Sequence, residues 1–126
     1  MILGVGNDIH DVRHVERYPE RYLHHFTAAE RQACEKRSER WQAYTSRFCI
    51  KEAVMKALGS NDVLGGVELI EIEVINTVSG RPTVTLRGGA ARQLDAITPA
   101  GTTAVVAVTA SDFFPFAIAY CTIWAG

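Results

Sequence analysis

Residues 47–59 carry a helical apolar stripe together with two charged side chains. At about 100° per residue, five apolar residues gather on one side of such a helix; they are Ile50, Ala53, Val54, Ala57 and Leu58. Glu52 and Lys56 fall on the opposite sector, one turn apart. Taken alone, this pair favours a solvated ion pair worth roughly a few tenths of a kcal/mol. The alternative is a core-packed helix that presents a carboxylate and an ammonium to a substrate.

The first nine residues form a second informative segment. Apolar residues dominate it, and Gly4 and Gly6 allow another backbone to approach closely. The segment predicts a short, largely buried strand that delivers Asp8 at its end. An acid in such a run is a turn or cap residue, a paired charge or a metal ligand. The residues alone leave these alternatives open.

The two segments together resemble the holo-acyl-carrier-protein synthases, the small 4′-phosphopantetheinyl transferases. The family's opening G-x-G-x-D-I is matched by Gly4, Gly6, Asp8 and Ile9. Its second motif, R-F-x-x-K-E-A-x-x-K-A-x-G, is matched by Arg47, Phe48, Lys51, Glu52, Ala53, Lys56, Ala57 and Gly59. Weaker similarities at 26–30, 72–82 and 116–119 extend the resemblance across nearly the whole chain.

The pattern of elements predicts an α+β fold with a mainly antiparallel sheet packed with helices. The resemblance implies the same, as one 4′-phosphopantetheinyl transferase domain over residues 1–126. Helices are expected at 11–24 (interrupted at Pro19), 27–37, 40–58 and 88–97. Strands are expected at 1–9, 67–75, 83–86, 104–110 and 116–124, with Gly65-Gly66 and Ser79-Gly80 as breaks.

Composition agrees with one small globular domain. A chain of 126 residues buries roughly two-thirds of its unfolded surface. The net charge of −1 argues against a general nucleic-acid or membrane binder. We expect no signal peptide and no membrane span. Cys34, Cys49 and Cys121 have no metal-like spacing, so free thiols in a reducing, cytoplasmic location are expected.

The resemblance implies transfer of 4′-phosphopantetheine from coenzyme A to a serine of an apo acyl carrier protein, releasing 3′,5′-ADP. Mg²⁺ suits such a transfer because it binds carboxylates, phosphates and water. Asp8 and Glu52 match the family's metal-binding carboxylates. Glu52, or a water that it orients, is a candidate acceptor of the serine proton. Lys56 is expected to neutralise the diphosphate and to stabilise the departing phosphate.

Further residues are candidates for contacts with coenzyme A. Arg47 could hold a phosphate of the adenosine end, or could be a surface charge. Gly59 and Ser60 offer a side-chain-poor backbone and a hydroxyl near the pyrophosphate. Arg81 and Pro82, after Gly80, resemble the family's turn beside the adenine, although a plain hairpin turn explains them equally well.

One departure from the family pattern affects this site. Many members carry a phosphate-binding His before the last strand, where this chain has Asp112. Arg37 and Arg40 lie in the region of the family's basic phosphate contacts, without an identical spacing. The loss of one cation leaves an alternative function open. In that alternative, the chain is a catalytically impaired relative that binds carrier protein or coenzyme A without turnover.

A basic stripe and an apolar terminal segment indicate protein partners. Arg13, Arg17 and Arg21 recur every four residues, as expected for docking an acidic carrier protein, or for a solvated helix face. Residues 113–124 hold more large apolar side chains than one sheet face can bury. The resemblance implies a homotrimer with the site at the subunit interface, where Asp8 faces the 47–59 helix of a neighbouring chain.

Overall fold

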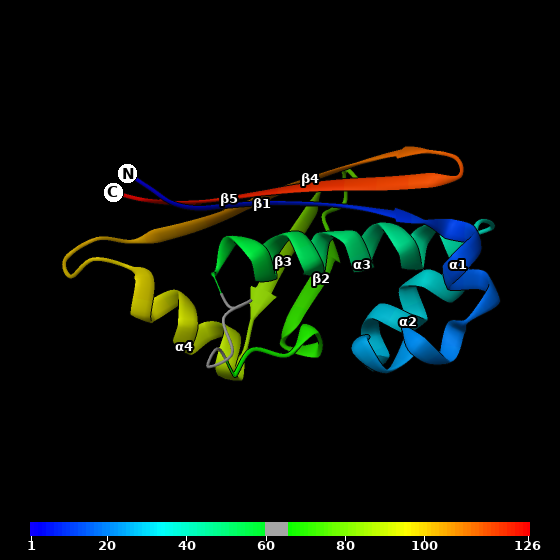
Figure 1. The fold of residues 1–126 in the computed structure, drawn as a ribbon, viewed down its shortest axis with the longest axis horizontal. Helices are drawn as coiled ribbons and strands as arrows, with labels where there is room; N and C mark the ends of the chain where they lie inside the picture. The colour runs from blue at the N-terminus through cyan, green and yellow to red at the C-terminus, as the bar shows by residue number, and fades with distance from the viewer. Residues whose placement is uncertain (60–65) are drawn as a thin grey trace.

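The computed structural model describes residues 1–59 and 66–126 and confirms the α+β class (Figure 1). The larger sheet is antiparallel in the order β1-β5-β4, and β2 pairs with β3 in a second antiparallel sheet. The strands are β1 (Ile2–Asp11), β2 (Ile72–Asn76), β3 (Pro82–Leu86), β4 (Ala104–Phe113) and β5 (Phe116–Ala125). The α-helices are α1 (Val12–Arg17), α2 (Ala28–Glu35), α3 (Arg40–Ala57) and α4 (Gly88–Ile97).

Helix α3 lies along one face of the larger sheet (Figure 1). Its predicted apolar stripe is buried, with Ile50, Ala53, Val54, Ala57 and Leu58 each at most 4% exposed. The helix comes close to β1 because Gly4 and Gly6 have no side chain. A methyl group at either position would collide with the carbonyl oxygen of Ala57 or Ala53. The prediction that these glycines allow a close backbone approach is therefore confirmed.

The strand register decides which side chains face α3. Residues paired directly across an antiparallel sheet point to the same face. Gly6 pairs with Cys121, which pairs with Val108 on β4, and all three are on the α3 side. Two residues along, the next row is Asp8, Ala119 and Ala110; the row after that is His10, Ala117 and Asp112. Asp8 and Asp112 thus share the α3 side, at opposite edges of the sheet.

Several predicted boundaries need correction. Strand β1 continues to Asp11, so Asp8 is not at its end, and β4 continues to Phe113. The prediction that β1 is largely buried is wrong, because Val5 and Ile9 on the face away from α3 are more than half exposed. The helix predicted at 11–24 ends at Arg17, and two 3-10 turns follow at Pro19–Arg21 and Leu23–His25. The strand predicted at 67–75 begins only at Ile72, because a 3-10 turn with a Glu68/Glu71 capping box precedes it at Leu69–Glu71.

Other local predictions are confirmed. Thr27 and Glu30 form the capping box that begins α2, and Gly59 ends α3 with a φ of 74°. The three cysteines are free and buried. Gly65 lies outside the described residues. Among the helices of the described residues, none is long and apolar enough to cross a membrane.

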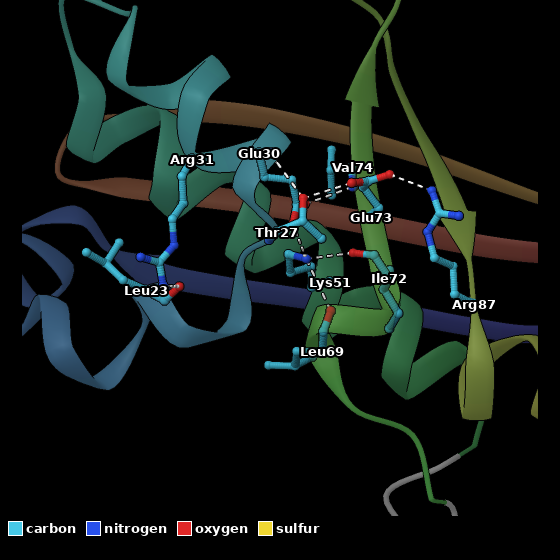
Figure 2. Close-up of polar contacts among 10 residues, drawn as sticks. All are labelled: Leu23, Thr27, Glu30, Arg31, Lys51, Leu69, Ile72, Glu73, Val74 and Arg87. Atoms are coloured by element: carbon cyan, nitrogen blue, oxygen red, sulfur yellow. Dashed lines mark hydrogen bonds and ion pairs between the residues drawn. The ribbon is translucent and has the colours of Figure 1, made fainter.

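A buried ion pair joins α2, α3 and β2 (Figure 2). The Lys51 Nζ atom lies 2.8 Å from a Glu30 carboxylate oxygen and also donates to the carbonyl oxygens of Leu69 and Ile72. Glu30 in turn accepts from the backbone N–H of Val74, 2.9 Å away. Burial lowers the pKa of Lys51, an effect that the Glu30 carboxylate opposes. Lys51 of the second motif therefore has a structural role in this fold.

Replacing Lys51 tests this role. Lys51→Met should lower the free energy of unfolding by about 3–5 kcal/mol, because it leaves the buried Glu30 carboxylate without a counter-charge. Urea denaturation at one fixed protein concentration measures this loss. Lys36→Met, at an exposed lysine, is the matched control. A loss below about 1 kcal/mol for Lys51→Met would match a surface ion pair and contradict the structural role.

Candidate active site

Three of the predicted site residues come together beside β1. The Lys56 Nζ atom lies 3.3 Å from the Asp8 Oδ1 atom and donates to the Asn7 carbonyl oxygen at 2.9 Å. Burial raises the pKa of Glu52, and the Asp8 charge raises it further, while Lys56 lowers it. The charges of Asp8 and Lys56 thus act on Glu52, and Lys56 contacts Asp8, so the three residues form one cluster. We call this cluster the carboxylate site.

The carboxylate site fits a divalent cation. The Asp8 side chain is only 15% exposed, and its Oδ2 atom is buried without a hydrogen-bond partner among the described residues. A buried carboxylate oxygen without a partner is costly, so it favours a cation. Asp8 and Glu52 would hold Mg²⁺, which commonly takes one or two carboxylates plus phosphate and water. Within residues 1–59 and 66–126, no group of three or more His, Cys, Asp or Glu side chains could hold a metal.

The expected position of Asp8 relative to the helix needs correction. We expected Asp8 to face the 47–59 helix of a neighbouring chain. Instead, its carboxylate contacts Lys56 of its own α3. The reason is the close approach of β1 to α3 at Gly4 and Gly6, which directs the next residue on the same face, Asp8, toward the helix.

A separate hollow of about 430 Å³ lies between α3, β4 and the β2–β3 hairpin. Its lining is mainly polar and includes Arg37, Ser38, Gln42, Ser46, Arg47, Asn76, Gly80, Pro82 and Asp112. Arg47 is 6% exposed; its Nη1 atom donates weakly to the Ala43 carbonyl oxygen at 3.4 Å. Its Nε atom has no partner among the described residues. This unsatisfied guanidinium fits an anionic ligand such as a phosphate. We call this hollow the arginine pocket.

The carboxylate site and the arginine pocket lie on opposite flanks of α3. Lys56 is nine residues after Arg47, which is about 180° around the helix. Asp8 belongs to β1 and Asp112 to β4, the two edge strands of the sheet. Helix α3 and the sheet therefore separate the two sites within one chain.

The other predicted coenzyme A contacts that the structure describes lie in the β2–β3 hairpin or directly after α3. Pro82 and Gly80 line the arginine pocket, whereas Arg81 is exposed and accepts a hydrogen bond from Thr77 through its carbonyl oxygen, in the hairpin turn. Gly59 follows α3 close to Lys56, and Ser60 lies outside the described residues.

The two arginines near the start of α3 differ in their surroundings. Arg37 lines the arginine pocket, where its charge lowers the pKa of Asp112 against the stronger, raising effect of burial. Arg40 forms an ion pair with Glu35 and lies over the Trp41 ring. Of the two, Arg37 is therefore the one placed to meet a ligand in the pocket.

The predicted basic stripe of Arg13, Arg17 and Arg21 does not form one continuous row of free cations. The guanidinium carbons of Arg17 and Arg21 lie 5.4 and 4.3 Å from the centre of the Tyr18 ring, in the range of cation–π contacts. Arg13 pairs with Asp11 at 2.7 Å, which offsets its charge. Because α1 ends at Arg17, the three arginines do not share one unbroken helix. The exposed cationic surface is therefore concentrated at Arg17 and Arg21.

Sequence reasoning missed an aromatic cluster next to this surface. The Tyr22 hydroxyl hydrogen-bonds to His10 Nε2 at 2.7 Å and also to His14 Nδ1. His10 and Tyr22 both pack edge-on against Phe48 of α3. Burial lowers the pKa of His10. The cluster fixes α1 to the end of β1 and to the middle of α3; the spacing of His10 and His14 is the only signal for it in the sequence.

Comparisons with known proteins identify the family of this chain. Residues 4–109 match the family model described as the 4′-phosphopantetheinyl transferase superfamily. The chain is 46% identical to the holo-[acyl-carrier-protein] synthase of Methylobacterium nodulans, over 98% of this chain and 96% of that protein. It is 45% identical to the enzyme of that name from Granulibacter bethesdensis, over 98% and 89%.

The fold is similar to those of solved synthase structures. The ACPS–CoA complex of Chronobacterium ammoniagenes has a TM-score of 0.82 at 24% identity, over 98% of this chain and 97% of that one. The Bacillus anthracis holo-(acyl-carrier-protein) synthase, solved with CoA (3′,5′-ADP), has a TM-score of 0.77 at 25% identity, over 98% and 96%. Since the family model covers most of the chain and the two relatives match it nearly end to end, this chain belongs to the 4′-phosphopantetheinyl transferase superfamily.

Proposed function

We propose that this chain is a Mg²⁺-dependent holo-acyl-carrier-protein synthase. It transfers 4′-phosphopantetheine from coenzyme A to a serine of an apo acyl carrier protein and releases 3′,5′-ADP. The observation that carries the proposal is the cluster of Asp8, Glu52 and Lys56 in a chain that belongs to the superfamily. Relatives named for this activity, and related structures solved with CoA, support the substrate assignment.

The chemistry follows from the charges in the carboxylate site. The serine oxygen attacks the phosphorus nearer the pantetheine arm, and the bond from that phosphorus to the bridging oxygen breaks. Negative charge then grows on the departing 3′,5′-ADP, which the Lys56 ammonium stabilises. Glu52, or a water that it orients, is proposed to accept the proton of the serine hydroxyl. Mg²⁺ held by Asp8 and Glu52 would supply further charge neutralisation.

The arginine pocket is proposed to hold the adenosine-phosphate end of coenzyme A. Arg47 and Arg37 supply positive charge there, offset in part by Glu39 and Asp112, and Gly80 and Pro82 line the side formed by the hairpin. This pocket faces away from the carboxylate site of its own chain. A single coenzyme therefore joins the pocket of one chain to the carboxylate site of another, so that the complete site lies at a subunit interface.

The bare face of the larger sheet supports assembly of several chains. On the side away from α3, several large side chains are about half exposed or more; they are Val5, Ile9, Val105, Tyr120 and Trp124. Among the described residues, no helix covers this face (Figure 1). An apolar face of this kind is typical of an interface. We propose a homotrimer; the family resemblance supplies the number three.

The proposed carrier surface is formed by Arg17, Arg21 and Arg13, next to the β1 end that leads to Asp8. Opposite charges on two partners accelerate association and orient the encounter. An acidic carrier would therefore approach along α1 with its serine directed toward the carboxylate site.

The first prediction concerns the metal. Asp8→Ala or Glu52→Gln should reduce the mass-shifted holo carrier formed per minute by about 100-fold or more, because each removes a ligand and a charge from the reacting phosphate. Excess EDTA should stop the wild-type reaction, and added Mg²⁺ should restore it. Asp95→Asn, at an exposed residue of α4, is the control. Full activity in EDTA excludes the metal role, and no carrier modification by wild type favours the non-catalytic alternative.

The second prediction concerns the shared site. Reassorting Glu52→Gln chains with Arg47→Gln chains should restore about a quarter of wild-type activity, since some interfaces then combine two intact halves. Reassorting Asp8→Ala chains with Glu52→Gln chains should restore none, because both carboxylates belong to one half. Light scattering before and after mixing reports the assembly. A fully active monomer would disprove the arrangement.

The third prediction concerns the carrier surface. Arg17→Glu with Arg21→Glu should raise the KM for the carrier protein by about tenfold and leave the KM for coenzyme A nearly unchanged. Arg13→Glu should have a smaller effect because Asp11 already offsets that charge. The wild-type KM for the carrier should rise with salt. Arg92→Glu on α4 is the control, and a KM independent of both salt and these arginines contradicts the docking surface.

A further inference from the structure

Lys56 lies where a cation bound to Asp8 would lie. Its Nζ atom lies 3.3 Å from Asp8 Oδ1, and the Asn7 carbonyl oxygen holds it from a second direction at 2.9 Å. The Asp8 Oδ2 atom remains buried without a partner among the described residues. The ammonium therefore pairs with one oxygen of a carboxylate that also fits a metal ion.

The two partners differ in their freedom to move. Asp8 belongs to a strand whose backbone pairs with β5, and its side chain is 15% exposed. The Lys56 side chain is 39% exposed and reaches Asp8 through a flexible four-carbon stem from α3. A second cation at Asp8 would meet repulsion from the ammonium. Lys56 is therefore the group that moves when a metal binds.

The destination of Lys56 follows from the proposed reaction, on which this inference rests. The diphosphate of coenzyme A carries more negative charge than one carboxylate, and it must lie next to the carboxylate site for transfer to occur. We propose that Lys56 acts as a temporary cation for Asp8, which it leaves for the diphosphate when coenzyme A binds. Lys56 thereby suppresses metal binding to the free enzyme and couples metal binding to coenzyme binding.

This coupling has a thermodynamic signature. If coenzyme A removes the ammonium from Asp8, it raises the affinity for the metal, and the metal raises the affinity for coenzyme A by the same factor. Direct bonds between metal and phosphate also couple the two ligands. The contribution of Lys56 is therefore seen in the metal affinity of the free enzyme, where no phosphate is present.

The experiment measures Mg²⁺ binding by calorimetry, with and without coenzyme A and without carrier protein. Lys56→Gln removes the charge but keeps an amide donor for the Asn7 carbonyl oxygen. In the absence of coenzyme A, this variant should bind Mg²⁺ about tenfold more tightly than wild type. Lys56→Arg should bind it more weakly, because a guanidinium pairs with a carboxylate through two parallel hydrogen bonds. Lys36→Gln, on the surface at the end of α2, should match wild type.

The coenzyme series completes the test. Adding coenzyme A should raise the Mg²⁺ affinity of wild type by a larger factor than that of Lys56→Gln. Unchanged or weaker Mg²⁺ binding by free Lys56→Gln, with normal binding by wild type plus coenzyme A, overturns this inference and leaves the proposed function intact. Absence of Mg²⁺ binding in every mixture, together with carrier modification in EDTA, overturns both this inference and the metal assignment.

Discussion

The contact of helix α3 with the β1 side of the larger sheet is the constraint on which the rest of this molecule depends. Gly4 and Gly6 allow the backbone of β1 to touch the helix at Ala53 and Ala57. No other residue type fits there without moving the helix away. Because side chains alternate along a strand, the next residue on the same face is Asp8, which lies beside Lys56 of the helix. The same two glycines therefore explain both the core packing and the position of the proposed metal ligand.

The second motif divides its charged residues between stability and chemistry. Lys51 is fully buried and holds α2 and the start of β2 to α3 through Glu30 and two carbonyl oxygens (Figure 2). Glu52 and Lys56 emerge on another side, next to β1. One helix thus carries a structural lysine and the pair proposed to act in catalysis within two turns. Neighbouring positions on a helix face different surroundings, which makes this division possible.

The opposite flanks of α3 give the fold two incomplete sites rather than one. The carboxylate site has two proposed metal ligands and a lysine, while the arginine pocket has a guanidinium whose Nε atom has no partner among the described residues. Neither alone would both hold an anionic coenzyme and promote transfer from it. In the proposed assembly, burial of the bare apolar face of the sheet would bring chains together and combine the two sites. In the proposed assembly, the contact that joins the chains also completes the catalytic site.

The sequence by itself determined the class of fold, the apolar stripe of α3, the capping box of α2 and the identity of the charged residues. Each depends on local pattern: helical periodicity, a Thr-to-Glu spacing and two motifs. Only the tertiary structure decided that Asp8 meets Lys56 of its own chain, that Lys51 is buried with Glu30, and that Tyr22 joins His10 to His14. These contacts join residues far apart in the chain, or on separate elements. The two glycines of β1 predict a close backbone approach, but only the packing of separate elements decides which residues meet.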